Sequence, residues 1–376
     1  MYFDADTLRR ILGAVHDPRK THPARTLVID ALLPLYGAIH LANFVGEKVD
    51  AFRHPEIDAI DVGQPIYIVA APRSGTTFLH RLMSLDPRFA TFTLYQTIFP
   101  TVAASELAER ARSSRTPVAK ITEVVEHSLD ESFGGWEGVH DTGLGADEED
   151  EAIWAMSMAT PAIFLLIPHP KEFPDQWYVD RLPEAKRRRL VETYERALKA
   201  RRFRHPDKTL LLKNVLLPSR YGLVLEAAPR ARFVHIVRHP YEVIPSALSL
   251  FTMPWTVVAP HDHGPSQATT EFADLLIDYY RFFYDREREA EASGDERFVS
   301  MRYRDLMDDP IAQLRRVYSR FDLPLRPEVE ARFRSELSRQ SEFKSGHAYS
   351  LEQFGLTREY IADRLGDVME HYGFEK

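Results

Sequence analysis

Cysteine is absent from the 376 residues of this chain. Its absence excludes disulfide bonds, zinc or iron–sulfur sites with thiolate ligands, and a cysteine nucleophile. It also fits a reducing compartment. Basic residues are not in excess, because 48 Lys and Arg stand against 56 Asp and Glu, for a formal net charge of -8. A dedicated nucleic-acid-binding protein is usually basic, so we expect no nucleic acid as a partner.

Long apolar runs are also lacking. The longest lies near Ala162–Ile167, far below the ~20 residues that cross a bilayer. The N-terminus carries Asp4 and Asp6 instead of the apolar core of a signal peptide. We therefore expect no stable membrane insertion and a cytoplasmic location.

Strand-length apolar runs alternate with helical periodicity along much of the chain. The runs lie at 66–70, 209–213, 232–238 and 297–301, and the helical patterns lie at 24–52, 219–228 and 271–292. This alternation predicts an α/β fold with a parallel sheet flanked by helices. We expect one domain over 1–376, with an N-terminal helical segment at 1–60 and a large, mainly helical insertion at about 100–205. The Pro- and His-rich stretch at 252–267 predicts a long surface loop.

The first predicted strand runs into a degenerate phosphate loop at Ala70–Thr77, with the sequence A-A-P-R-S-G-T-T. A strand end, a glycine that lets the backbone turn and a helix N-terminus together point amide groups at an anion. The hydroxyls of Ser74, Thr76 and Thr77 add donors. A plain strand–turn–helix joint with a Ser/Thr cap is the alternative interpretation of this segment taken alone.

The parts of a nucleotide triphosphatase site that handle metal-bound phosphates are lacking. Thr76 stands where a lysine would reach the β- and γ-phosphates. The next two predicted strands end in Lys213 and Arg238 instead of a magnesium-binding aspartate. We therefore expect an anion site without a metal, in which Arg73 joins Lys213 and Arg238 in supplying positive charge. The sequence His261-Asp262-His263 has no third ligand at a helpful spacing and is interpreted as a loop.

A second motif begins at Arg238, where a strand ends. Pro240 fits the start of a helix, and Ser246 follows eight positions after the arginine. A guanidinium fork and a hydroxyl suit a second phosphate. An arginine in a surface ion pair and an exposed serine are the alternative.

Together these segments resemble the PAPS-dependent sulfotransferases, in particular their bacterial branch, where PAPS is 3'-phosphoadenosine 5'-phosphosulfate. Pro72–Thr77 is similar to the family's P-[KR]-S-G-T-T motif, which grips the 5'-phosphosulfate, and Arg238 with Ser246 matches the pair that holds the 3'-phosphate. Lys213 stands where the family has a lysine upstream of that pair. Many members have lysine in place of Arg73, and arginine cannot donate a proton at neutral pH.

Two further segments resemble the family towards the C-terminus. Met301–Leu306 resembles a strand-end R-Y-x-D-L segment near the nucleotide, and 344–356 resembles a segment that closes over it. The resemblance covers about 65–98 and 209–370. It implies these nucleotide-binding residues: Arg73, Ser74, Gly75, Thr76, Thr77, Arg238, Ser246, Tyr303, Lys344 and Gly346.

The implied reaction moves the sulfuryl group of PAPS to a hydroxyl of a small acceptor and releases 3',5'-ADP. Aromatic residues of the helical middle and of the 252–267 stretch favour a lipophilic acceptor, with core packing as the alternative: Phe133, Trp136, Trp154, Phe164, Phe173, Trp177 and Trp255. It needs charge stabilisation, expected from Arg73 and Lys213, and a general base. The family's K-T-H signature, whose histidine is the base where it occurs, is absent because Asn214 and Val215 follow Lys213. The candidate bases lie in 130–151 and comprise Asp130, Glu131, Glu137, His140, Asp141, Glu148 and Glu149.

Of these candidates we favour His140, because a neutral imidazole is suited to proton transfer near pH 7, and keep Glu149 as the carboxylate candidate. A histidine in a surface loop, and acids that only complement a helix dipole, are the alternatives. A P-loop kinase of a small molecule or an inactive nucleotide-binding protein remain alternative functions. The sequence indicates neither the identity of the acceptor nor the oligomeric state.

Overall fold

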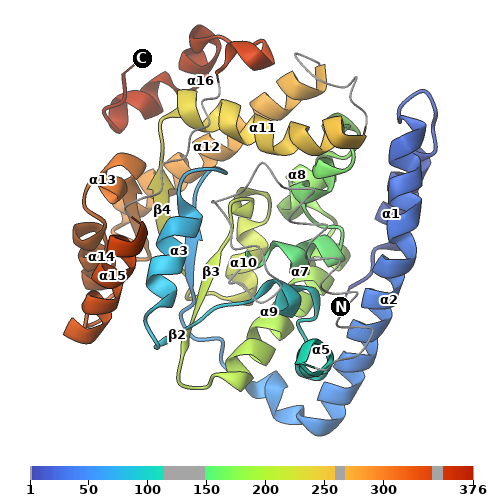
Figure 1. Ribbon diagram of the computed structural model, residues 1–376, viewed down its shortest axis with the longest axis horizontal. Coiled ribbons are helices and arrows are strands. Elements are labelled where there is room, and N and C mark those ends of the chain that lie inside the picture. The colour runs from blue at the N-terminus through green and yellow to red at the C-terminus, as the bar shows by residue number, and fades with distance from the viewer. Residues whose placement is uncertain (1, 114–148, 259–266, 341–349, 376) are drawn as a thin grey trace.

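The computed structural model describes residues 2–113, 149–258, 267–340 and 350–375 (Figure 1). Five parallel strands are arranged in the order β2-β3-β1-β4-β5. Their bounds are β1 Ile66–Val69, β2 Phe89–Ala90, β3 Thr209–Lys213, β4 Arg232–Val237 and β5 Phe298–Arg302. The predicted α/β fold with a parallel sheet is confirmed. Strand β2 was not predicted, because two residues are too few to show a period.

Both faces of the sheet are buried. Ile66 and Ile68 of β1 point into one hydrophobic core, and the alternate residues Tyr67 and Val69 point into another. Helices cover each face, which is why the strands read as near-continuous apolar runs instead of alternating ones.

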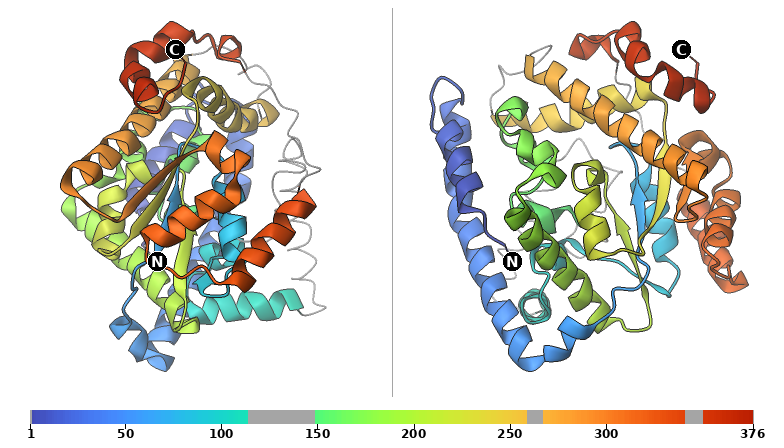
Figure 2. Two further views of the ribbon diagram at one scale, coloured as in Figure 1. Left: turned by 90° about the vertical axis from the view of Figure 1, so that its left-hand side faces the viewer. Right: turned by 180° about the vertical axis from the view of Figure 1, so that it is seen from behind.

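The two layers of helices differ in their place along the chain (Figure 2). One core is closed by α3 (Thr76–Ser84), α13 (Tyr303–Asp308), α14 (Pro310–Arg320) and α15 (Pro327–Gln340). The core on the other face is closed by α7 (Glu151–Met156), α9 (Glu184–Arg204), α10 (Tyr221–Ala227) and α12 (Gln267–Ser293). A third core joins α12 to α1 (Ala5–Val15), α8 (Pro174–Trp177), α11 (Pro240–Val258) and α16 (Arg358–His371).

Most of the described residues between β2 and β3 lie in helices and 3-10 turns, and the division of the chain into a domain with an insertion stays a prediction. Besides α7, α8 and α9, they comprise α4 (Leu94–Ile98), α5 (Val102–Ser113) and 3-10 turns at Pro161–Leu165, Pro170–Glu172 and Val179–Arg181. Another 3-10 turn, Leu217–Ser219, follows β3, and two more lie at Pro55–Ala59 and Glu352–Phe354.

The surface loop predicted at 252–267 is wrong in its first half. Helix α11 continues to Val258, because Phe251 and Trp255 are buried on its inner side. The indole Nε1 of Trp255 donates to the carbonyl oxygen of Phe164 at 2.7 Å. Residues 259–266 of the predicted loop lie outside the described residues, and its last residue, Gln267, begins α12.

Helix α2 (Pro23–Arg53) forms the right-hand edge of the molecule in Figure 1. Among the described residues, it is the helix long and apolar enough to cross a membrane. A scan for uninterrupted apolar runs overlooks it because Pro34, Gly37, His40 and Asn43 interrupt the apolar residues between Asp30 and Glu47. The expectations of no stable membrane insertion and of a cytoplasmic location therefore stay predictions.

The strand order fixes the place of a ligand site. From the central β1, the chain builds β3 and β2 on one side and β4 and β5 on the other. The carboxyl ends of β3, β1 and β4 therefore meet where the direction of winding reverses, and ligands of open α/β sheets bind at such a point.

Candidate anion-binding site

The loop after β1 has an unusual backbone. Gly75 has a φ of +86°, and a Cβ added there would lie 2.7 Å from Cε2 of Tyr303, so only glycine fits both the conformation and the space. Arg73 has a φ of 72°, which is uncommon for a residue with a side chain. Strain of this kind is concentrated at functional sites.

The same loop leads into α3, whose first residue is Thr76. Ser74 is completely buried, and its Oγ has no hydrogen-bond partner among the described residues. A buried hydroxyl without a partner is costly, so its position beside a helix N-terminus fits an oxyanion that would accept its hydrogen bond. The loop therefore fits an oxyanion such as a phosphate or sulfate group.

The two predicted anion motifs meet in space. Arg73 Nε donates to Ser246 Oγ at 3.4 Å, and Arg238 Nη1 donates to the carbonyl oxygen of Arg73 at 2.9 Å. The Arg238 guanidinium lies over the ring of Tyr303, 4.6 Å from its centroid, and Arg238 Nε pairs with Glu242 at 2.9 Å. The structure thus brings together residues that the sequence placed in separate motifs.

Lys213, at the end of β3, connects the loop to an acidic segment. Its side chain is fully buried, and its Nζ lies 3.1 Å from Thr77 Oγ1 and 3.5 Å from Glu149 Oε1. Burial raises the pKa of Glu149, as does the neighbouring Asp150, while Lys213 lowers it in part. A carboxylate with a raised pKa beside a cation is suited to accept a proton.

The two acids that follow point inward as well. Asp150 accepts from Asn214 Nδ2 at 2.6 Å and from the Tyr194 hydroxyl. Glu151 pairs with the buried Arg220, and burial raises the pKa of Glu151 to about 7. The alternative of solvated acids that only complement a helix dipole is therefore wrong for 149–151.

Sequence reasoning missed the residues that anchor this segment. Asn214 departs from the family's K-T-H signature, and its side chain bridges Asp150 and the backbone N–H of Leu216. Tyr194 and Arg220 come from α9 and from the turn before α10. No local pattern marks them, because their partners are 44 and 69 residues away in the sequence.

Three predicted residues lie outside the described part of the chain. They are His140, Lys344 and Gly346. The other predicted residues are Arg73, Ser74, Gly75, Thr76, Thr77, Glu149, Lys213, Arg238, Ser246 and Tyr303, and they lie at or beside the carboxyl ends of β1, β3, β4 and β5.

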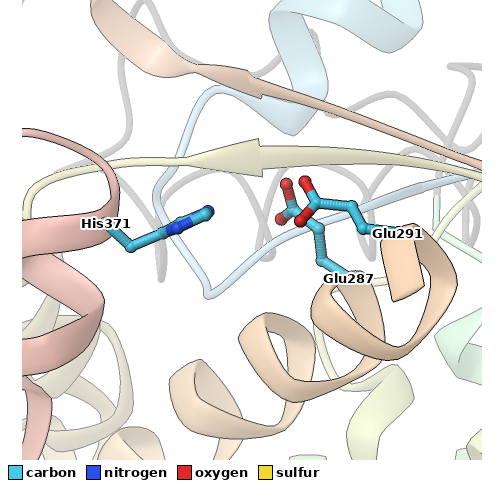
Figure 3. A group of neighbouring side chains, drawn as sticks. All are labelled: Glu287, Glu291 and His371. Carbon is cyan, nitrogen blue, oxygen red and sulfur yellow. The ribbon is translucent and has the colours of Figure 1, made fainter.

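One group of potential metal ligands occurs in the described part of the chain, away from the phosphate loop. Glu287 and Glu291 of α12 and His371 of α16 point toward one another (Figure 3). The Glu287 carboxylate already accepts from the Tyr372 hydroxyl and lies 3.2 Å from Nδ1 of His235. We assign this group to packing between α12 and α16, and the expectation of a metal-free anion site stays a prediction.

A phosphate loop after the central strand, with cations at the ends of the strands on either side, defines a phosphate-loop α/β protein. The chain belongs to the sulfotransferase family, since the model of that family matches residues 65–327. The resemblance inferred from the motifs is thereby confirmed.

Curated relatives and solved structures agree with this assignment. The chain is 29% identical over 326 residues to omega-hydroxy-beta-dihydromenaquinone-9 sulfotransferase Stf3 of Mycobacterium bovis and of Mycobacterium tuberculosis, covering 83% of this chain and 76% of each relative. The fold is similar to that of sulfotransferase STF9 from Mycobacterium avium (TM-score 0.74, 23% identity, 99% of this chain and 93% of that chain). It is also similar to STF1 from Mycobacterium tuberculosis H37Rv (TM-score 0.72, 20% identity, 96% of this chain and 91% of that chain).

Proposed function

We propose that this protein transfers the sulfuryl group of PAPS to a hydroxyl of a lipophilic acceptor and releases 3',5'-ADP. The observation that carries the proposal is the contact between the two anion motifs, Arg73 Nε to Ser246 Oγ and Arg238 Nη1 to the Arg73 carbonyl. A donor with two separate anionic groups on one nucleoside needs two such sites side by side. PAPS supplies an activated sulfuryl group when bound.

The loop and its cations hold the donor in this proposal. Amides of the loop and the hydroxyls of Ser74, Thr76 and Thr77 face the 5' end, while Arg238 and Ser246 bind the 3'-phosphate. Arg73 stabilises the oxygen that gains charge as the bond to sulfur breaks. Lys213, 3.1 Å from Thr77 Oγ1, adds positive charge at the same place without a metal.

Glu149 takes the proton of the acceptor hydroxyl in this proposal. It lies 3.5 Å from Lys213, and burial raises its pKa above the ordinary carboxyl value. Both features support a proton acceptor beside the loop. His140, which the sequence favoured, remains the alternative base.

The lipophilic class of the acceptor rests on the relatives, which are named for a hydroxylated dihydromenaquinone. We propose a hydroxyl on a long apolar molecule of that general kind. The test is transfer of radiolabelled sulfate from PAPS to a panel that contains an ω-hydroxylated dihydromenaquinone, a long-chain alcohol and a phenol. Labelling of the phenol alone would contradict the lipophilic acceptor.

Thermal unfolding separates the alternative functions. We expect 3',5'-ADP to stabilise the protein equally with magnesium and with EDTA, by about 2.7 kcal/mol at roughly 100 times its dissociation constant. Equal stabilisation by ATP, or a loss of the effect in EDTA, would favour a P-loop kinase. Binding of 3',5'-ADP and PAPS with no labelled product from any acceptor would favour an inactive nucleotide-binding protein.

A further inference from the structure

Helix α2 is amphipathic with its polar side turned inward. Tyr36 Oη and His40 Nε2 donate to the carbonyl oxygen of Met156 at 2.8 and 2.6 Å. Asn43 Nδ2 donates to the carbonyl oxygen of Ile98 at 2.8 Å. Asp50 accepts from the backbone N–H groups of Val102 and Ala103 at 2.7 and 2.8 Å. These bonds fix which side of α2 faces the protein.

The outer side of α2 carries a regular apolar pattern. Its exposed residues recur in steps of four and three over the length of the helix, which is the heptad spacing of a coiled-coil seam. We name this set the α2 stripe: Leu27, Ala31, Pro34, Ala38, Leu41, Val45, Lys48 and Phe52.

The α2 stripe is exposed to an unusual degree for its composition. Leu27 and Phe52, near its two ends, expose 71% and 87% of their surface, and Leu41 in the middle exposes 63%. Its apolar neighbours on the flanks, Leu32, Leu35 and Phe44, expose a further 43%, 51% and 55%, so the apolar surface extends along the whole helix. An exposed apolar surface of this extent is typical of an interaction site.

We propose that the α2 stripe pairs with the α2 stripe of a second copy of this chain in an antiparallel, two-fold symmetric dimer. The stripe is complementary to itself when reversed about the point between residues 39 and 40. Reversal places the large Leu41 against Ala38, and Val45 against Pro34. Phe52 then lies against Leu27, so that large side chains meet smaller ones in the middle and each other only at the ends.

The charges of α2 match in the same register. Lys48 interrupts the stripe, and Asp30 lies directly before Ala31, the residue that Lys48 opposes in the reversed pairing. Both side chains lie on the same flank of the helix, because 18 residues at 100° each make five full turns. The Asp30 carboxylate already lies 3.2 Å from Nε2 of His16 in its own copy. The dimer adds two Asp30–Lys48 ion pairs between the copies, as an isologous interface requires.

A lipid surface suits the stripe less well. Lys48, whose Nζ lies 5.5 Å from the centroid of the Phe44 ring, would face hydrocarbon without an ion-pair partner among the described residues, with Asp30 on the same flank. A charged side chain in that place is costly. The formal net charge of -8 also opposes approach to an anionic membrane. A second copy of the chain is therefore the partner that the stripe fits best.

The first test is the oligomeric state of the full chain by sedimentation equilibrium. We expect a dimer for the wild type and at least a 100-fold larger dissociation constant for Leu41→Glu, because the change enters a symmetric interface twice. Leu41 is exposed, so the monomer keeps its fold, which circular dichroism checks. A monomeric wild type at ~50 µM would overturn the proposal, as would a dimer that Leu41→Glu leaves intact.

Charge exchange tests the register. Asp30→Lys and Lys48→Asp should each weaken the dimer about tenfold, and the double variant should restore it. Asp308→Lys, on α13 at the opposite side of the molecule (Figure 1), is the matched control and should change nothing. Failure of the double variant to recover affinity would exclude the antiparallel register.

A vesicle assay tests the lipid alternative. If a monomeric wild type sediments with phosphatidylcholine–phosphatidylglycerol vesicles and Leu41→Glu abolishes this, the stripe binds lipid and the dimer proposal is overturned.

Discussion

Glu149 and Glu287 are both carboxylates largely withdrawn from solvent, with 22% and 9% of their side chains exposed, yet their pKa values shift in opposite directions. Burial raises the pKa of Glu149, Asp150 adds to the effect, and Lys213 offsets it only in part. Burial would also raise the pKa of Glu287, but the hydrogen bond and charge of His235 and the Tyr372 hydroxyl outweigh it and bring the pKa to about 2.

The role of a buried carboxylate therefore depends on its partners. Glu287 is held by donors on two elements and stays ionised, which suits a structural contact. Glu149 is poised nearer to protonation, beside a lysine that also contacts the phosphate loop. If this comparison is right, replacement of Glu149 affects turnover, and replacement of Glu287 affects stability.

The largest expected effect is the loss of turnover in Glu149→Gln. The amide keeps the size of the side chain but cannot take a proton, so kcat should fall about 10²- to 10⁴-fold, while the Kd for 3',5'-ADP stays within about threefold. Glu287→Gln, assayed well below its unfolding temperature, should keep its kcat. Steady-state kinetics and calorimetric titration make the comparison.

The pH profile of kcat tests the same assignment. A base must be unprotonated, so activity should fall as the pH drops through the pKa of Glu149, at a pH above the ordinary 4.5 because that pKa is raised. The residual activity of Glu149→Gln should lack this limb. An active Glu149→Gln together with a dead His140→Ala that still binds 3',5'-ADP would move the base to His140.

Arg73→Ala should have the next largest effect. Its guanidinium acts on charge that develops only as the donor bond breaks, so kcat should fall about 10²- to 10³-fold and the affinity for PAPS much less. Arg73→Lys should recover much of the loss, because it restores a cation at the same bend. Near-normal turnover in Arg73→Ala would refute the proposed mechanism.

How much of the fold and of the site could be predicted from the sequence depends on how far apart in the chain the contacting residues are. The phosphate loop is a contiguous segment whose function rests on its backbone, so the glycine and hydroxyls of 72–77 sufficed to predict it. The parallel sheet could likewise be predicted from four apolar runs, because each run is a contiguous segment of the sequence. Arg238 and Ser246 could be predicted as one motif because they belong to one strand–helix joint, and in the structure each contacts Arg73.

The acidic segment could not be predicted in the same way. Glu149 and Asp150 have the composition of a solvated helix start. They turn inward because their partners come from distant parts of the chain: Lys213 for Glu149, and Asn214 and Tyr194 for Asp150. The periodicity of α2 likewise predicted a helix but not which side faces the protein. That choice depends on hydrogen bonds such as Asn43 to Ile98, 55 residues apart.

Arg238→Ala tests the cationic side of the site. It removes the proposed partner of the 3'-phosphate, so binding of 3',5'-ADP should weaken by about 2–4 kcal/mol. Adenosine 5'-phosphosulfate, which lacks that phosphate, should bind almost as before. Isothermal titration with both ligands is the measurement, and equal losses would make Arg238 structural.

The smallest expected effect concerns Glu287, the other half of the comparison. Its pKa falls on folding from 4.5 to about 2, so its ionised form stabilises the native state above pH 4.5, and this contribution disappears as the pH falls towards 2. The full shift corresponds to about 3 kcal/mol. Urea unfolding should show Glu287→Gln less stable than the wild type by up to this amount at pH 6. The difference in unfolding free energy between the two proteins should shrink at acidic pH.

The control is Glu291→Gln, one turn further along α12. Among the ion pairs of the described residues, Glu291 pairs only with its helical neighbour Arg288, so the change should alter stability by less than about 0.5 kcal/mol at any pH. A gap that stays constant from pH 6 to pH 3 would show that the Glu287 carboxylate is not held by its donors, and the contrast with Glu149 would then fail.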